Sequence, residues 1–383
     1  MTIKITLEEA LNKASLRLRR KIEHSVELLR SAEELALKYD SELGYWLAFS
    51  CGKDSQALFH IAQLAGVRFK AHFSPTSIDP AEVIRFCKTR YPEVEIIPCK
   101  TSIFTQAVEM GILPTMRIRW CCAVFKEGHG AGKVTLTGIR RSESAKRSKR
   151  NEVEVSGRKF SGDLDKFSEY SKKRMAKMMK HLNQDQFSDA KENEVRCING
   201  KDKIIINPII DWDEDDVWEF LNEVVEVPHC KLYDAPYNRK RIGCILCPMS
   251  SHKRKIQDCE EYPHVKRKWL EAISKIRGGY VVKTGILGLS TPPPHRYIKF
   301  GEQISAAVLG NPIHAQRDRA QVDSGTTGEI GGFAPFCNSP EKKLSEEQIC
   351  EYIFDWWISG KAYDKWFAET FQPKLFNDED FKQ

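Results

Sequence analysis

The segment YWLAFSCGKDSQALFHIAQLAG, residues 45–66, constrains the fold more than any other part of the chain. It reads as an apolar strand, a short polar turn and a helix that ends at Gly66. Further strands are indicated over residues 67–75, 94–100, 133–140 and 203–212, and further helices over residues 79–92, 102–111 and 213–225. This alternation predicts an α/β fold, a doubly wound parallel sheet with helices on both faces.

The composition is that of a soluble globular protein, with 41% hydrophobic and 30% charged residues in a chain of 383. No apolar run approaches the ~20 residues of a membrane span. The N-terminal sequence lacks the apolar core of a signal peptide, so we expect a cytoplasmic protein without a membrane partner. The formal net charge of +7 fits polyanionic partners, from nucleotides to nucleic acid.

A polar turn separates the first strand from its helix. It consists of Ser50, Cys51, Gly52, Lys53, Asp54 and Ser55. Free N–H groups at a helix start bind phosphate, Gly52 allows close approach to the backbone, and Lys53 adds a positive charge. Asp54 suits a helix cap or a ligand for Mg²⁺ carried by a nucleotide. The Walker pattern G-x-x-x-x-G-K-[ST] is absent, so the turn predicts a phosphate site of another kind.

Four cysteines form the second signal. Cys121 and Cys122 are adjacent, and Cys244 and Cys247 form a C-x-x-C pair far downstream. Two such pairs can supply the four thiolates of one metal site. Adjacent side chains in extended backbone point apart, which suits the separate iron corners of a [4Fe–4S] cluster better than one zinc ion. Zinc and buried free thiols remain the alternatives.

These motifs resemble those of a known superfamily. The turn is similar to the S-G-G-K-D-S signature of the PP-loop ATP pyrophosphatases, which bind pyrophosphate there while a substrate is adenylated. Cys51 replaces the usual first glycine and fits the turn if its φ is negative. The cysteine pattern resembles the cluster motif of the adenylylsulfate reductase branch of the phosphoadenylylsulfate (PAPS) reductase family, itself a PP-loop family. The segments over residues 138–147, 207–221 and 237–248 agree, so the resemblance covers about residues 40–270.

The resemblance implies a PP-loop (adenine-nucleotide α-hydrolase-like) sheet and a set of site residues. Lys53, Asp54 and Ser55 would be catalytic, with ATP and Mg²⁺ bound. Nucleotide contacts would come from Ser50, Cys51, Gly52, Lys53, Asp54, Ser55, Gly138, Arg140, Arg141 and Arg147. Phe73 and Ser74 are added because of their position at the end of the second strand, where an open α/β sheet receives its nucleotide. Cys121, Cys122, Cys244 and Cys247 would hold the [4Fe–4S] cluster, or zinc in the alternative.

This interpretation divides the chain into three parts. Residues 1–40 form a helical N-terminal segment. Residues 41–270 form the PP-loop domain, with the four cysteines and a charged insertion at about residues 142–200. Residues 271–383 form a C-terminal region with a Gly-rich loop and a helical end. These boundaries predict a nucleotide-binding core with helical additions at both ends.

Three functions are consistent with the sequence. The first is an iron–sulfur ATP pyrophosphatase that adenylates a substrate for sulfur transfer, as the enzymes of DNA phosphorothioation do. The second is a divergent adenylylsulfate or PAPS reductase, but the usual C-terminal Glu-Cys-Gly-Leu-His motif is absent and Cys337 is the remaining nucleophile. The third is a non-catalytic nucleotide- or DNA-binding regulator. The basic insertion suggests nucleic acid as a partner, and sulfur transfer would need a donor protein such as a cysteine desulfurase.

Overall fold

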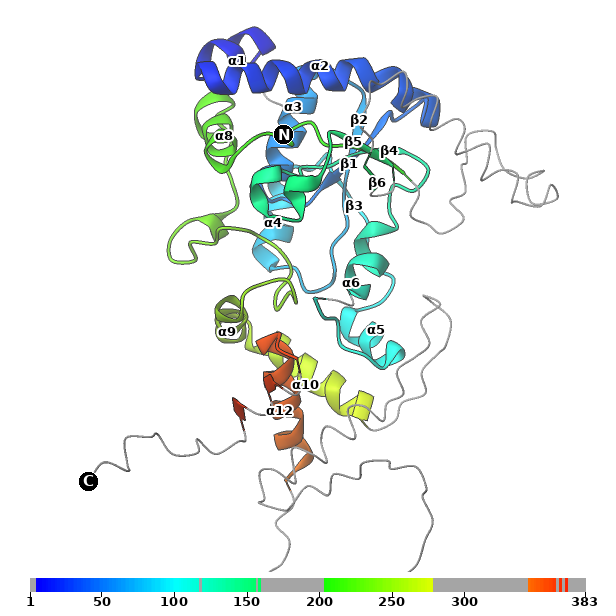
Figure 1. The fold of residues 1–383 in the computed structure, drawn as a ribbon, viewed down its shortest axis with the longest axis vertical. Coiled ribbons are helices and arrows are strands. Elements are labelled where there is room, and N and C mark those ends of the chain that lie inside the picture. The colour runs from blue at the N-terminus through cyan, green and yellow to red at the C-terminus, as the bar shows by residue number, and fades with distance from the viewer. Residues whose placement is uncertain are drawn as a thin grey trace, which may run out of the picture. The chain divides into compact units, whose positions relative to one another are not determined.

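A computed structural model of the chain describes residues 5–116, 119–155, 158–159, 203–277, 344–362, 365–366 and 369–370 (Figure 1). The chain forms two compact units. The first comprises Met1–Ile103 and Arg119–Ile245, and the second comprises Phe104–Ile118 and Leu246–Gln383. Cys337 and most of the charged insertion lie outside the described residues, and the three-part domain division remains a prediction.

The first unit is built on a mostly parallel seven-stranded sheet. Its strands are β1 (Tyr45–Phe49), β2 (Phe69–Phe73), β3 (Glu95–Ile96), β4 (Val134–Leu136), β5 (Val153–Val155), β6 (Arg158–Lys159) and β7 (Ile204–Ile206). The strand order is β3-β2-β1-β4-β7-β5-β6. Neighbours from β3 to β7 pair in parallel, whereas β5 pairs antiparallel with β7 and with β6. The predicted α/β fold is confirmed, with an antiparallel edge that sequence patterns did not indicate.

That antiparallel edge lies within the segment expected to be a charged loop. Val153 and Glu154 of β5 are both buried, and Glu154 is ion-paired with Arg150. A strand of three residues is too short to show a hydrophobic period. Its charged flanks therefore concealed it in the sequence.

The helices of the first unit follow the expected order. They are α1 (Leu7–Lys13), α2 (Leu16–Tyr39), α3 (Lys53–Ala65), α4 (Ala81–Arg90), α6 (Trp120–Cys122) and α8 (Glu214–Glu219), with π-helical turns over Ala123–Glu127 and Phe220–Val224. The helical pattern over residues 5–40 is divided in two because Ser15 caps α2, its hydroxyl accepting a hydrogen bond from the Leu18 N–H. Helix α3 ends at Gly66, as predicted, and Gly66 has the left-handed conformation.

The strand order creates a topological switch point. The chain runs from β1 outward to β2 and β3, then returns to β4 on the other side of β1. Right-handed crossovers in opposite directions place helices on opposite faces of a sheet. A crevice opens at the carboxyl ends of the two strands where the direction reverses. Here those strands are β1 and β4, which end just before Ser50 and the Gly138 segment.

The second unit is helical in its described parts. It contains most of α5 (Ile103–Met110), α9 (His252–Glu261), α10 (Pro263–Arg277) and α12 (Glu346–Ser359). Trp269 packs against Phe104 and Trp357, and the Trp357 indole N–H donates to the Pro114 carbonyl at 2.6 Å. None of the helices in the described part of the chain combines the length and apolar character needed to cross a bilayer.

Candidate functional site

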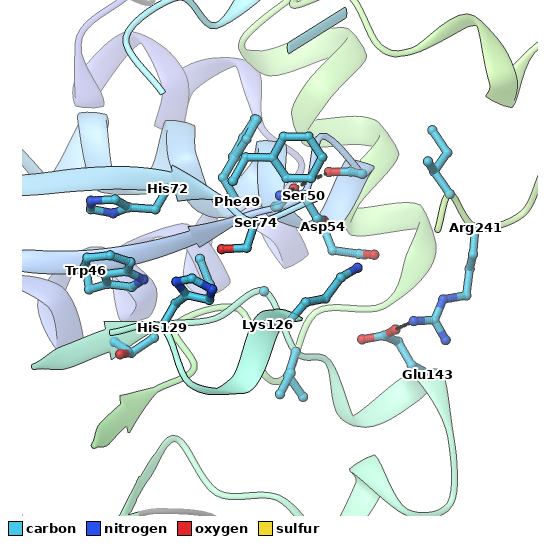
Figure 2. A pocket seen from close by; sticks show the side chains of 18 of the residues that line it. Trp46, Phe49, Ser50, Asp54, His72, Ser74, Lys126, His129, Glu143 and Arg241 are labelled. Carbon is cyan, nitrogen blue, oxygen red and sulfur yellow. Dashed lines mark hydrogen bonds and ion pairs between the residues drawn. The ribbon is translucent and has the colours of Figure 1, made fainter. Parts of the chain in front are cut away.

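A cavity of about 260 Å³ lies at the switch point of the first unit (Figure 2). Its floor is one face of the sheet, where Trp46, Ala48 and Ser50 alternate along and just beyond β1. The predicted residues that line it are Ser50, Gly52, Asp54, Ser55, Phe73, Ser74, Gly138 and Arg147. Residues that sequence reasoning did not assign to it are Trp46, Ala48, Phe49, His72, Lys126, His129, Thr135, Ile139, Glu143, Lys203, Tyr233, Arg241 and Ile242.

The turn between β1 and α3 forms one end of the cavity. Gly52 is the N-cap of α3 and has no side chain to satisfy the first N–H groups of the helix. The Ser55 hydroxyl accepts from the Ser50 N–H at 3.1 Å and donates to the Gly52 carbonyl at 2.8 Å. The Ser50 hydroxyl lies 3.2 Å from that of Ser55. The turn Ser50–Ser55 is thus held in shape by its own hydrogen bonds, and the N–H groups at the start of α3 suit it to anion binding. We call this turn the anion-binding corner.

Cys51 does not have the negative φ at which a residue other than glycine fits this turn easily. Its φ is +58°, in the left-handed region that favours glycine. The side chain is fully buried and does not line the cavity. Burial raises the pKa of the Cys51 thiol, and a hydrogen bond with the Cys87 thiol raises it further. Packing against the core therefore holds a cysteine where the family has glycine.

Lys53 occupies an unexpected environment. Its ammonium donates to the Lys240 carbonyl at 2.7 Å and lies 5.3 Å from the centre of the Tyr233 ring. It is 1% exposed and does not line the cavity. That Lys53 binds phosphate through its ammonium remains a prediction. The position of the ammonium, outside the cavity lining, does not support it.

Tyr233 contacts the backbone of the turn from a distant part of the sequence. Its hydroxyl accepts a hydrogen bond from the Lys53 backbone N–H at 2.8 Å. Burial raises the pKa of Tyr233, so the hydroxyl keeps its proton at neutral pH. Only its position between two motif segments, residues 207–221 and 237–248, could have indicated this role in the sequence.

Asp54 is held by the segment that follows β4. The Arg140 guanidinium donates through Nε to the Asp54 carboxylate at 2.7 Å, and through Nη1 to the Ser142 hydroxyl at 3.0 Å. Gly138 packs against the same turn, since a Cβ atom there would lie 2.8 Å from the Asp54 carbonyl oxygen. The sequence placed both segments in one site, and the structure brings them into contact.

The remaining predicted arginines differ in position. Arg141 is ion-paired with Asp211 and donates to the Arg150 carbonyl, away from the cavity lining. Arg147 lines the cavity and is ion-paired with Glu143. Figure 2 shows the Glu143 carboxylate beside the guanidinium of Arg241, which also lines the cavity and lies 3.2 Å away.

The other end of the cavity is aromatic. The rings of Trp46 and His72 are stacked, with their centroids 3.4 Å apart and their planes 2° from parallel. Burial lowers the pKa of His72 to about 4, and burial also lowers the pKa of His129. Both imidazoles are therefore neutral at pH 7. The cavity combines an anion-binding end with a planar, apolar end, a combination that suits a nucleotide.

Three of the four predicted cluster ligands lie in the first unit. Cys244 accepts hydrogen bonds from the Thr76 hydroxyl at 3.1 Å and from the Lys126 ammonium at 3.4 Å. The Arg119 guanidinium donates to the Cys122 Sγ at 3.2 Å. A hydrogen bond from Cys121 and the charge of Arg119 lower the pKa of Cys122 to about 5.

Thiolates are the ligands of iron–sulfur clusters, so this donor set fits such a group chemically. Cys247 follows Cys244 by three residues and belongs to the second unit. Among the described residues, no group of three or more His, Cys, Asp or Glu side chains is arranged to hold a metal ion. The ligand set of Cys121, Cys122, Cys244 and Cys247 therefore remains a prediction.

Residues 44–250, more than half of the chain, match the family described as the phosphoadenosine phosphosulfate reductase domain. An uncharacterised protein of Methanocaldococcus jannaschii is 24% identical over 280 residues. That alignment covers 70% of this chain but only 56% of the archaeal protein, so the chain spans little more than half of this relative.

Solved structures give weaker similarities. Candida glabrata FMN adenylyltransferase is 14% identical with a TM-score of 0.37, over 62% of this chain and 67% of that one. The U34-tRNA thiolase NcsA of Methanococcus maripaludis, solved with its [4Fe–4S] cluster, is 14% identical with a TM-score of 0.30, over 70% of this chain and 85% of that one. Similarity at this level does not define a substrate.

Proposed function

Because the chain belongs to the phosphoadenosine phosphosulfate reductase domain family, we propose that it is a PP-loop ATP pyrophosphatase that adenylates a substrate for sulfur transfer. In this reaction an oxygen of the substrate attacks the α-phosphorus of ATP. The bond between the α-phosphorus and the bridging oxygen breaks, and pyrophosphate leaves with the bonding electron pair. The adenylated oxygen is then a good leaving group for an incoming sulfur.

The observation that carries this proposal is the cavity between the anion-binding corner and the Gly138–Arg147 segment. The backbone N–H groups of Gly52 and Ser55 and the Ser50 hydroxyl would bind the pyrophosphate portion of ATP. Asp54 presents a carboxylate beside them, and carboxylate oxygen is a preferred ligand of Mg²⁺. Arg147 supplies positive charge at the cavity wall.

The nucleoside would lie toward the stacked pair of Trp46 and His72. Trp46 and Ser50 are four residue steps apart in extended backbone, a length of ~13 Å. A triphosphate bound at one end can thus direct its base toward the aromatic end. Phe73 of β2 pairs in register with Phe49 of β1, so Phe73 and Ser74 line the cavity beside its anion-binding end.

We further propose that Cys121, Cys122, Cys244 and Cys247 hold a [4Fe–4S] cluster. When bound, the cluster would supply a structural and electrostatic centre close to the cavity. Lys126 both lines the cavity and donates to Cys244, and the charge of Cys244 raises its pKa in spite of its burial. Lys126 therefore carries its positive charge between the thiolates and the bound phosphates.

The acceptor that we propose is a nucleic acid, with a sulfur-donor protein such as a cysteine desulfurase as the partner. Exposed lysines lie in the two segments that contribute Arg147 and Arg241 to the cavity. They are Lys146, Lys149 and Lys240. Such lysines would bind the backbone phosphates of the nucleic acid and make the affinity for nucleic acid depend on salt concentration.

The central test is pyrophosphate release from ATP and Mg²⁺ by the anaerobically purified chain, with and without nucleic acid. Asp54→Asn should reduce the rate by about 100-fold or more, as loss of an electrostatic group in an active site does. Asp234→Asn is the matched control, because Asp234 is an exposed acid paired with His229 outside the cavity lining. ATP that neither binds nor turns over would refute the proposal, as would full activity of Asp54→Asn.

The cluster has its own test, which does not depend on turnover. The wild-type chain should contain four irons and four sulfides per molecule, and Cys244→Ala should lose most of both. Cys259→Ala, which changes a partly buried thiol in α9, should keep them. Stoichiometric zinc in place of iron would establish the alternative metal.

A further inference from the structure

We propose that the Tyr233 hydroxyl is a direct donor to the phosphates of the bound nucleotide and extends the anion-binding corner. This inference deepens the proposed function and rests on it. It adds a residue from outside the Ser50–Ser55 turn to the phosphate site. It also explains how the corner binds an anion although the Lys53 ammonium is directed elsewhere.

The position of the hydroxyl carries the inference. It accepts from the Lys53 N–H, the first backbone donor of α3, at 2.8 Å. A Cβ atom built on Gly52 would lie 3.4 Å from the same hydroxyl and 3.6 Å from the Ser50 Oγ. Tyr233 and both of these residues line the cavity. The hydroxyl therefore lies next to the start of α3, where an oxygen of a bound phosphate would also lie.

The hydrogen-bonding capacity of a phenol supports a relay. A phenolic oxygen accepts with its lone pairs and donates one proton. The Lys53 N–H uses a lone pair, and among the described contacts no protein acceptor takes the hydroxyl proton. That proton is available to a ligand oxygen. A hydroxyl polarised by an N–H donor is a stronger donor itself, so the two groups act in series.

The ring is fixed in place, which favours a defined role. It makes an edge-to-face contact with Trp218 at 5.1 Å, and the Lys53 ammonium lies 5.3 Å from its centre. Burial raises the pKa of Tyr233, so it stays a neutral donor. A partly buried donor held by packing loses little entropy when it binds an anion.

The experiment is a calorimetric titration of the full chain with ATP, AMP and adenosine. For Tyr233→Phe we expect roughly ten- to hundred-fold weaker binding of ATP, the range for a lost hydrogen bond to a charged acceptor. Binding of adenosine should not change, because adenosine has no phosphate. A merely structural role of the hydroxyl would weaken all three ligands alike.

Tyr237→Phe is the matched control. Tyr237 lies in the same loop but does not line the cavity, so its removal should leave all three affinities unchanged. Tyr233→Phe that binds ATP as tightly as the wild type, or more tightly, would overturn the inference and leave the proposed function standing. A wild-type chain that binds no adenine nucleotide would instead overturn both.

A second variant covers the case in which Tyr233→Phe does not fold. Replacing Tyr233 with 3-fluorotyrosine keeps the hydroxyl and makes it a stronger donor. ATP should then bind more tightly than to the wild-type chain, with adenosine unchanged. Unchanged or weaker ATP binding by this variant would count against a direct contact.

Discussion

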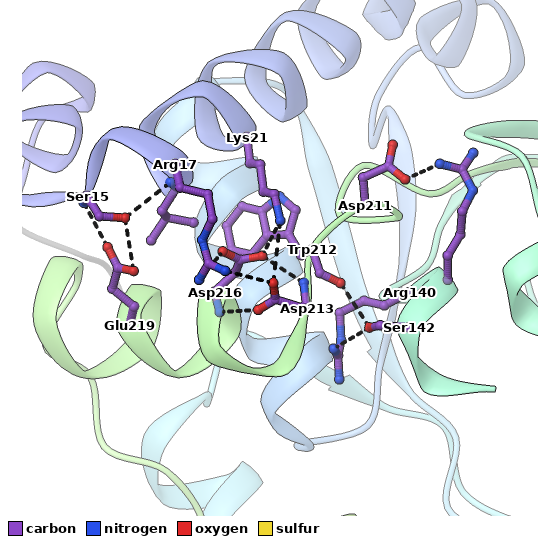
Figure 3. A network of polar contacts seen from close by, with 12 residues as sticks. Ser15, Arg17, Lys21, Arg140, Ser142, Asp211, Trp212, Asp213, Asp216 and Glu219 are labelled. Carbon is purple, nitrogen blue, oxygen red and sulfur yellow. Dashed lines mark hydrogen bonds and ion pairs between the residues drawn. The ribbon is translucent and has the colours of Figure 1, made fainter.

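Two groups of ion pairs in the first unit use the same chemistry for different ends. One joins α2 to the start of α8, where Arg17 and Lys21 pair with Asp213 and Asp216 (Figure 3). The other borders the cavity, where Arg140 pairs with Asp54, and Arg147 and Arg241 pair with Glu143.

Access to the cavity distinguishes the two groups, since each contains an almost fully buried carboxylate, Asp216 in the first and Glu143 in the second. Asp216 of α8 is fully buried and is ion-paired with Arg17 and Lys21, which both belong to α2. Arg241 in the second group is 62% exposed, and Asp54, Glu143 and Arg147 all line a cavity that a ligand can enter. Charges of the first kind fix the packing of elements, whereas charges of the second kind can exchange one partner for a substrate.

Hydrogen bonds through Trp212 join the two groups. The Trp212 indole N–H donates to the Ser25 hydroxyl on α2. The Trp212 carbonyl accepts from the Ser142 hydroxyl, which in turn accepts from Arg140 (Figure 3). The helix network therefore supports the arginine that holds Asp54. The comparison can be tested by changing each group separately.

The largest effect on stability should come from Asp216→Asn. This change leaves Arg17 and Lys21 without their buried counter-charge, and we expect the free energy of unfolding to fall by about 3 kcal/mol. Urea denaturation measures it. Glu23→Gln, which removes an exposed pair with Arg19, should cost less than about 0.5 kcal/mol. Equal losses in the two variants would show that the burial of Asp216 does not strengthen its ion pairs.

Gly138→Ala should have the next largest effect. The added methyl group would lie 2.8 Å from the Asp54 carbonyl oxygen, so the turn and the β4 segment must separate. We expect a loss of about 1–3 kcal/mol, as for other overpacked sites, together with weaker ATP binding. Gly128→Ala, whose nearest neighbour would be 3.9 Å away, is the control. A Gly138→Ala variant with wild-type stability would show that the contact is loose.

A change in pH should distinguish the two regions. The pKa of His72 is lowered to about 4 in the folded chain, below the ~6.5 of an unfolded histidine. The contribution of neutral His72 to the free energy of unfolding is thus fully present above pH 6.5 and is lost as the pH falls toward 4. The free energy of unfolding should fall by about 2 kcal/mol between pH 7 and pH 5 for this reason. Burial lowers the pKa of His60 in the same direction.

Removal of one histidine isolates its share of this pH dependence. His72→Gln should flatten the stability profile between pH 6.5 and 4 relative to the wild type. The pKa of Asp213 is lowered from 3.8, despite the opposing effect of burial, by a backbone hydrogen bond from Asp216 and by the charges of Lys21 and Arg17. The ion pairs of α2 and α8 should therefore weaken only below about pH 4. An unchanged slope in His72→Gln would refute the assignment.

The smallest effect on stability should come from Arg147→Ala. Its side chain is partly exposed, so we expect a change in unfolding free energy within about 0.5 kcal/mol. ATP affinity should fall several-fold, because a cation is lost from the cavity wall. Titration and denaturation of the same sample measure both. A large loss of stability without a loss of affinity would place Arg147 in the structural group instead.

The sequence determined the local elements and their order. A strand, a turn and a helix at residues 45–66 follow from apolar spacing and from Gly66, and these depend on interactions within a few residues. The alternation of elements was enough to predict the mostly parallel sheet. It could not indicate β5 and β6, whose shortness and charged surroundings hide their pairing.

Only the tertiary structure decided which side chains meet at the site. The Tyr233 hydroxyl meets the Lys53 N–H across 180 residues of chain, and the Lys53 ammonium turns to the Lys240 carbonyl across 187. Cys51 keeps a positive φ because the core takes its side chain. Contacts of this kind are fixed by the order of strands and by packing, which no local pattern of residues records.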